Sequence, residues 1–182
     1  MPRTEKSTQK RAENRIKTLM ERDFRMEVKI FLSISYGGMH KKKNKYGACV
    51  EYITPKGKVA TRYYYGDAPD NTGYNQIMLV ALVHAMRNLN KPCYITAYVK
   101  SEYIENMLNR GLPGKWEKNG WRNAKNEPVA CYEHWSELLR MLNIHNLTFA
   151  KAYDNDYTEE MNKNLHELRR ESDNESNGSS KL

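Results

Sequence analysis

The sequence predicts an α/β domain in which helices flank a mixed five-stranded sheet. Three segments in the first third of the chain alternate apolar and polar residues and are separated by short turns, a pattern typical of an antiparallel meander. Later strand segments alternate with helical ones, which adds strands to the sheet and covers its faces. With 182 residues, the chain is long enough for one domain with a single core and two tails. The expected element order is βββαβα, a loop-rich insertion, then αβα.

The strands follow from the alternation and from the turns between them. A turn rich in Gly and Lys follows the first strand, and Pro55-Lys56-Gly57 follows the second. The two later strands are short apolar segments that stand between helical patterns. We expect strands over residues 28–36, 46–53, 58–65, 94–99 and 147–151.

The helices follow from apolar spacing and from capping residues. Residues 77–83 are apolar nearly all round, as expected of a helix buried against a sheet, and this helix is predicted over residues 71–90. Ser101 is a suitable N-cap for a helix over residues 101–109. Two further helices are expected over residues 132–142 and 158–170.

The two ends of the chain differ in composition from the domain over residues 28–170. Residues 1–27 are rich in charges of both signs, with apolar residues at helical spacing, and predict a basic arm or a short amphipathic helix. Residues 171–182 contain almost no apolar residues, and we expect a disordered polar tail there.

The charge and the cysteines narrow the classes of function. The chain has 30 Lys and Arg against 22 Asp and Glu, a net charge of +8, which favours a polyanionic partner such as nucleic acid. The charge alone fits a membrane surface or an acidic protein equally well. Three scattered cysteines indicate neither a disulfide framework nor a zinc site. Because no apolar run is long enough to span a membrane and no secretory signal is present, we expect a cytoplasmic protein without membrane contact.

One stretch of the insertion carries a specific pattern. Residues 115–135, which we call the handle, resemble the basic handle region of the type 1 ribonuclease H family. The positions that match are Trp116, Gly120, Trp121, Pro128, Val129 and Trp135. Three shorter matches are Tyr46-Gly47-Ala48, Asp70-Asn71-Thr72 and Ser101-Glu102-Tyr103-Ile104. The resemblance covers about residues 28–170 and implies a ribonuclease H-like fold.

The resemblance also implies where a catalytic centre would lie. The family hydrolyses the RNA strand of an RNA/DNA hybrid with two divalent metals that four carboxylates hold. These four positions fall on Ser33, Asn75, Lys100 and Asn162, none of which is a carboxylate. The family's mobile-loop histidine falls near Tyr153. On this basis the sequence indicates a pseudoenzyme, with no catalytic residue, no metal and no cofactor.

Three groups of residues are candidates for nucleic-acid contacts. In the handle, basic residues interleave with two tryptophans, a pattern suited to phosphate contacts backed by aromatic packing. The alternative is that the tryptophans form the core of the handle and the cations a solvated face. The handle candidates are Lys115, Trp116, Lys118, Trp121, Arg122 and Lys125.

The other two groups lie in turns. The resemblance implies that Asn71 reaches a minor groove, and the alternative is that Asn71 caps a helix. Lys41, Lys42 and Lys43 belong to a basic cluster in the first turn that would attract a nucleic-acid backbone, and the alternative is a solvated turn.

Three hypotheses of function remain open. The first is a catalytically inactive ribonuclease H-like protein that binds RNA/DNA hybrid, duplex or structured RNA without cleaving it. The second is a protein-interaction or scaffold module of a phage or mobile element. The third is an active ribonuclease H in which a displaced site binds Mg²⁺ through Asp154, Asp156, Glu159 and Glu160. The sequence does not determine the preferred nucleic acid or the oligomeric state.

Overall fold

The computed structural model describes residues 26–38 and 44–178 of the chain, with side chains as far as Ser172. A mixed five-stranded sheet, with the strand order β3-β2-β1-β4-β5, forms its centre. β1 pairs antiparallel with β2 and β2 with β3, whereas β1 pairs parallel with β4 and β4 with β5. The strands are β1 (Met26–Ser35), β2 (Lys45–Ile53), β3 (Val59–Asp67), β4 (Cys93–Val99) and β5 (Asn146–Lys151).

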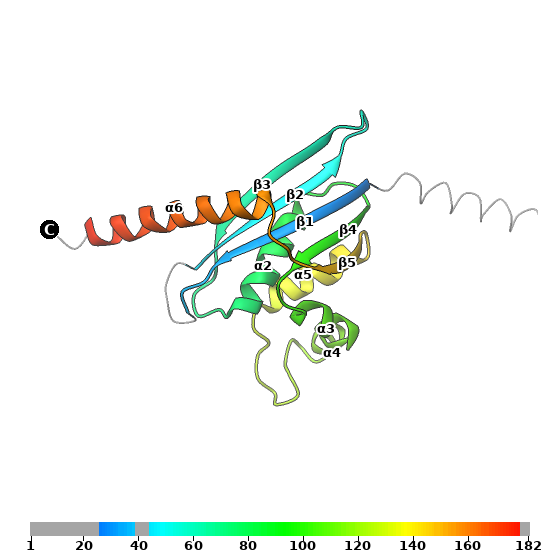
Figure 1. Ribbon diagram of the computed structural model, residues 1–182. Helices are drawn as coiled ribbons and strands as arrows, with labels where there is room; N and C mark the ends of the chain where they lie inside the picture. Colours follow the sequence, from blue (N-terminus) through cyan, green and yellow to red (C-terminus); the bar gives the residue numbers. More distant parts are fainter. Residues whose placement is uncertain (1–25, 39–43, 179–182) are drawn as a thin grey trace, which may run out of the picture.

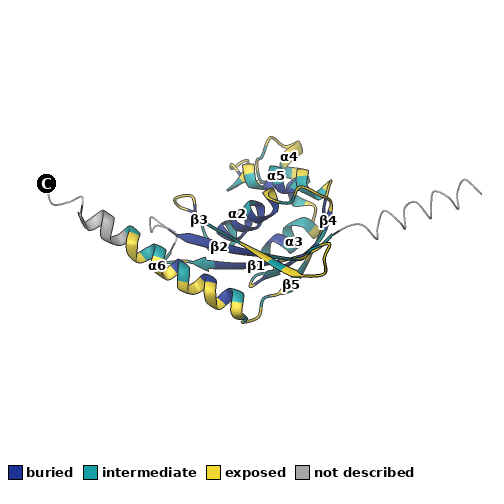
Figure 2. Ribbon diagram, turned by 90° about the horizontal axis from the view of Figure 1, so that it is seen from above, coloured by how far each residue is buried: buried dark blue, intermediate teal, exposed yellow. Residues whose placement is uncertain are grey.

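Helices cover both faces of this sheet (Figure 1). On one face lie α2 (Tyr74–Arg87), α3 (Tyr103–Asn109) and α5 (Tyr132–Leu142), with α4 (Leu112–Lys118) beside them in the insertion. The opposite face carries α6 (Asp156–Gly178), which contacts β1 and β2 (Figure 2). The element order confirms the predicted βββαβα, insertion, αβα pattern, with α4 as an addition within the insertion.

The alternation along the strands divides the apolar residues between two clusters. In β1, Ile30 and Leu32 belong to the main core beneath α2, whereas Phe31 between them belongs to a smaller cluster beneath α6. The three consecutive tyrosines of β3 follow the same rule, since Tyr64 packs on the main core and its two neighbours on the smaller cluster. Tyr64 therefore faces the opposite side of the sheet from Tyr63 and Tyr65.

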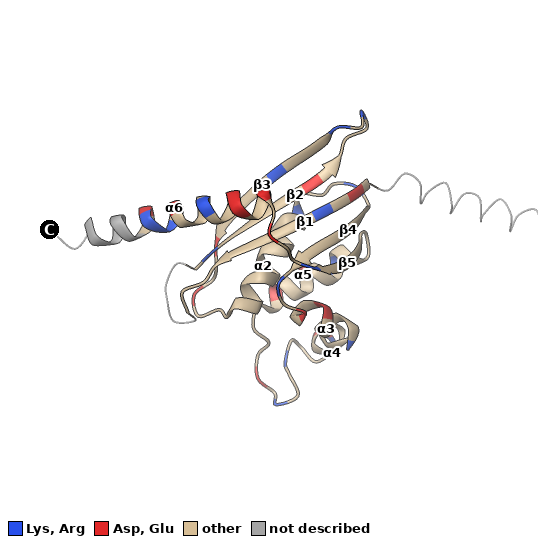
Figure 3. Ribbon diagram, viewed as in Figure 1, with Lys and Arg blue, Asp and Glu red and all other residues tan. Residues whose placement is uncertain are grey.

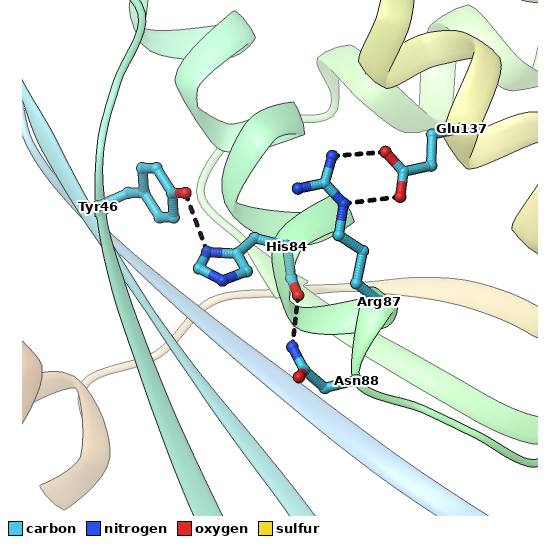
Figure 4. A network of polar contacts seen from close by, with 5 residues as sticks. All are labelled: Tyr46, His84, Arg87, Asn88 and Glu137. Carbon is cyan, nitrogen blue, oxygen red and sulfur yellow. Dashed lines mark hydrogen bonds and ion pairs between the residues drawn. The ribbon is translucent and has the colours of Figure 1, made fainter.

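A group of polar contacts connects α2 with β2 and α5 (Figure 4). The Tyr46 hydroxyl lies 2.9 Å from Nδ1 of His84, and Arg87 pairs with Glu137. Asn88 donates to the backbone carbonyl of His84 at 3.0 Å. Burial, together with the nearby Arg87 charge, lowers the pKa of His84, so the ring that faces Tyr46 is neutral at neutral pH.

Two element boundaries differ from the expectation at the ends of the domain. β1 begins at Met26, so the last two residues assigned to the N-terminal arm belong to the sheet, and the rest of that arm lies outside the described residues. α6 runs to Gly178, into the segment that its composition predicts to be disordered. Because adding a residue to a formed helix costs far less than starting one, α6 continues past its packed part. Ser172 Oγ donates to the backbone carbonyl of Leu168 there.

In the part of the chain that the structure describes, no helix is both long and apolar enough to cross a membrane.

Candidate functional site at the end of β1 and in the handle

Two side chains that are far apart in the sequence meet where β1 ends. Ser33 of β1 is 8 % exposed, and its hydroxyl donates a hydrogen bond to the side-chain oxygen of Asn162 on α6. α6 packs along β1 and β2. This packing brings Asn162 next to Ser33, two of the four positions that correspond to the family's metal ligands. The structure therefore brings together Ser33 and Asn162, as the resemblance implies.

The other two positions flank this pair. Lys100 directly follows β4 and is exposed. The parallel register of β1 and β4 extends to Phe31 opposite Tyr98, so Ser33 and Lys100 each lie two residues beyond the last paired position, at the same edge of the sheet. Asn75 is the second residue of α2 and is half-buried. Among the hydrogen bonds of the described residues, none joins Asn75 or Lys100 to Ser33 or Asn162.

A second contact between α6 and β1 was not predicted from the sequence. Arg169 donates from Nη1 to Ser35 Oγ at 3.3 Å, and both residues are half-buried. Ser35 lies two residues after Ser33, and Arg169 lies seven residues after Asn162. A seven-residue spacing is two helical turns, so this periodicity was the one signal that could have pointed to Arg169.

The tryptophans of the handle pack inward. Trp135 of α5 is completely buried, and Trp116 of α4 meets it edge to face with ring centroids 5.8 Å apart. Trp121 adopts a φ of 60° and packs against Tyr132 at 6.0 Å. Both Trp116 and Trp121 are half-buried against the main core. These contacts match the alternative in which the tryptophans are the core of the handle, and a contact of either ring with nucleic acid stays a prediction.

The cations of the handle lie on its surface. Lys115 and Lys118 are exposed on α4, and Arg122 and Lys125 are exposed on the loop that follows. Arg122 donates from Nη1 to the backbone carbonyl of Asn126 at 2.7 Å, which orients its guanidinium. Within the described part of the chain, none of these four cations forms an ion pair. The handle therefore presents four exposed cations, together with the exposed carboxylates of Glu117, Glu127 and Glu133.

Asn71 stands in the loop before α2. It is exposed, and its φ of 57° departs from helical geometry. Gly73 is the N-cap of α2, so the interpretation of Asn71 as a helix cap is wrong. Asn71 instead lines a cavity of about 370 Å³ with residues of the handle that include Cys131 and Tyr132.

The basic cluster of the first turn is described only in part. Lys41, Lys42 and Lys43 lie outside the described residues. Lys45 of the same cluster is buried at the start of β2, and its ammonium lies 2.5 Å from the carboxylate of Asp67. Lys45 therefore serves the structure of the sheet.

Comparison with known proteins identifies the family. The sequence model of ribonuclease H matches residues 27–169, most of the chain. The chain belongs to the ribonuclease H family. Ribonuclease H of Caldicellulosiruptor saccharolyticus is 36% identical over 112 residues, which cover 58% of this chain and 77% of that protein. Ribonuclease H of Lachnoclostridium phytofermentans is 33% identical over 131 residues, which cover 71% of this chain and 82% of that protein.

Solved structures of other proteins share the fold. LC9-RNase H1, described as a type 1 RNase H with the type 2 active-site motif, superposes with a TM-score of 0.57 at 20% identity. This alignment covers 76% of the present chain and 70% of LC9-RNase H1. The foamy viral protease-reverse transcriptase in complex with dsDNA gives a TM-score of 0.51 at 16% identity, over 75% of this chain and 86% of that one. The ribonuclease H-like fold expected from the sequence is confirmed.

The comparisons correct one interpretation of the sequence. The absence of carboxylates at four positions favoured a protein that is not an enzyme. Relatives that are 33% and 36% identical to this chain over the aligned residues are named as the enzyme ribonuclease H, and this finding contradicts that interpretation. That interpretation depended only on the residues at four positions and not on the similarity of the rest of the chain.

The side chains at those four positions do not fit the metals of the family. The Ser33 hydroxyl donates a hydrogen bond to Asn162, both groups are neutral, and Lys100 is a cation, whereas Mg²⁺ prefers anionic oxygen ligands. Within residues 26–38 and 44–178, no three His, Cys, Asp or Glu side chains gather closely enough to hold a metal ion. This includes Asp154, Asp156, Glu159 and Glu160, of which Glu160 accepts a hydrogen bond from Tyr63 at 2.8 Å.

Proposed function

We propose that this ribonuclease H-family protein binds nucleic acid through the cations of its handle, with RNA/DNA hybrid as the first ligand to test. The observation that carries the proposal is the group of four exposed handle cations without ion pairs among the described residues. Support for the class of ligand comes from the family and from the net charge of +8.

The handle suits contacts with a phosphate backbone for two reasons. Lys115 and Lys118 are three residues apart on α4, so they share one side of that helix. The packing of Trp116 on Trp135 fixes α4 on the main core, so these cations project from a rigid base. Each phosphate that a cation neutralises releases counterions, which makes such binding depend strongly on salt.

The test measures the affinity of the full chain for labelled RNA/DNA hybrid, double-stranded DNA, double-stranded RNA and single strands over a range of salt concentrations. The handle variant replaces four cations by alanine, Lys115, Lys118, Arg122 and Lys125. The control variant removes four exposed cations elsewhere on the surface, Lys56, Lys58, Arg62 and Lys91. Both variants carry the same net charge, so a difference between them reports position and not total charge.

We expect the handle variant to bind more weakly and to flatten the slope of log K against log salt by about 0.9 for each duplex phosphate that the protein no longer neutralises. Equal behaviour of the two variants, or a wild type that binds none of the four ligands near physiological salt, would contradict the proposal. In the latter case the basic surface points to a protein partner. Cleavage of the RNA strand, measured on the same hybrid with Mg²⁺ or Mn²⁺, reports hydrolysis separately from binding.

A further inference from the structure

The junction between α6 and the end of β1 offers hydrogen-bond donors. Arg169 uses one N–H group on Ser35 Oγ, and a guanidinium has five. The side-chain oxygen of Asn162 accepts the hydrogen bond from Ser33, so this contact does not use the two amide N–H donors of Asn162. A surface that supplies donors and positive charge suits an anion.

No acidic side chain of the described residues forms an ion pair with Arg169. The ion pairs found among these residues join Lys29 with Glu51, Lys45 with Asp67, and Arg87 with Glu137. α6 begins with acidic residues, and further along its basic residues Lys163, Arg169 and Arg170 alternate with Glu167 and Glu171 (Figure 3). Arg169 is half-buried, which removes part of the solvent screening around its charge.

Secondary structure fixes the positions of these donors. Ser33 and Ser35 lie on one face of β1, about 6.8 Å apart for two residues of a strand. Asn162 and Arg169 lie about 10.5 Å apart along α6, two turns of an α-helix. The two hydrogen bonds therefore hold one side of α6 along the end of β1, and Lys100 adds a further exposed cation at the same edge of the sheet.

We propose that Arg169, Asn162 and Ser35 form a phosphate site that binds the backbone of a nucleic acid without a divalent cation. The inference rests on the nucleic-acid binding proposed above and adds a contact surface on the face of the sheet opposite α2. The phosphate oxygens accept hydrogen bonds from the free guanidinium N–H groups of Arg169 and from the amide of Asn162. Charge-assisted hydrogen bonds of this kind are roughly twice as strong as neutral ones.

The substitution that tests the site has a close control in the chain. Arg169→Gln removes the charge at the junction, whereas Arg170→Gln removes the same charge from the next residue, which is exposed. We expect Arg169→Gln to weaken binding of RNA/DNA hybrid about tenfold and to flatten the salt slope by about 0.9. Arg170→Gln is expected to change both far less. Thermal unfolding of both variants checks the fold. If Arg169→Gln does not fold, Ser35→Ala tests the site instead, because it removes the hydrogen bond that positions Arg169 but keeps the charge. We expect Ser35→Ala to lose less affinity than Arg169→Gln would.

The second arm of the test varies the metal. We expect wild-type affinity for the hybrid to be the same in EDTA and in Mg²⁺ at matched ionic strength. Affinity that is lost in EDTA, or equal effects of Arg169→Gln and Arg170→Gln, would overturn the phosphate site. If the handle variant weakens binding and Arg169→Gln does not, the phosphate site is wrong and the function proposed for the handle stands. If the wild type binds no nucleic acid, both proposals fail.

Discussion

Arg87 of α2 and Glu137 of α5 form an ion pair with two parallel hydrogen bonds. Nε lies 2.7 Å from Oε1, and Nη2 lies 2.6 Å from Oε2. The side chain of Glu137 is only 20% exposed, whereas that of Arg87 is 50% exposed. The pair connects the helix beneath the sheet to the helix that supplies Trp135 to the core.

The ion pair is expected to stabilise the packing of α2 on α5. We expect the coupling energy between Arg87→Ala and Glu137→Ala to be about 1 kcal/mol in a double-mutant cycle, near the upper end for pairs with one exposed partner. Urea denaturation of the wild type, both single variants and the double variant measures it. Strictly additive effects would mean that the two side chains act independently.

The same pair predicts a dependence of stability on pH. The hydrogen bond from Arg87 holds the pKa of Glu137 below its usual value of 4.5. A carboxylate with a lowered pKa in the folded state adds stability above its unfolded pKa, and this stability is lost as the pH falls through the folded pKa. We expect the urea midpoint to fall below pH 4.5 less steeply in Glu137→Gln than in the wild type. Parallel pH profiles of the two proteins would rule out this contribution.

Restoring carboxylates at the end of β1 should make the fold sensitive to metal. In Ser33→Asp with Asn162→Asp, two carboxylates would stand where a hydrogen bond now joins the side chains, and their repulsion raises the pKa of one of them. We expect a lower Tm than the wild type in EDTA and a recovery in Mg²⁺, measured by thermal unfolding. The wild type and the single variant Ser33→Asn serve as controls, and we expect neither to respond to Mg²⁺. If the Tm of the double variant does not change with Mg²⁺, these two positions do not form a shared metal site.

Lys100 is expected to attract nucleic acid from the edge of the sheet next to Ser33. Lys100→Asp replaces an exposed cation by an anion there, and we expect weaker binding of RNA/DNA hybrid with a flatter salt slope. Lys91→Asp makes the same charge change at the other end of β4, where Lys91 is exposed two residues before the strand. Equal losses in the two variants would indicate that only the net charge matters.

The strand pattern was predicted from the sequence because its period of two survives in short segments. The three tyrosines of β3 follow this period, since Tyr64 packs on one face and its two neighbours pack on the other. α4 was missed because its first residues, Leu112, Pro113 and Gly114, suggest a loop. Proline is nevertheless compatible with the first turn of a helix, where its missing N–H has no partner to lose.

The candidate site was predictable only in part. The resemblance selected Ser33 and Asn162, which are 129 residues apart, because no local pattern connects them. The contact between Arg169 and Ser35 could not be predicted from the sequence, because the position of α6 depends on its packing with β1 and β2. The sequence also left two roles open for the handle tryptophans, and the packing of Trp116 on Trp135 assigns the first of them to the core.

The order in which the chain is synthesised has a consequence for α6. This helix supplies Met161 to the smaller apolar cluster as well as Asn162 and Arg169 to the junction with β1. All five strands precede it in the chain. On a ribosome, the sheet can therefore pair completely while Phe31 and Cys49 still lack their α6 neighbours Tyr157 and Met161, and the face that carries the proposed phosphate site is finished last. A nascent chain that stops before Met161 would contain the whole handle, so it could engage nucleic acid before its second face exists.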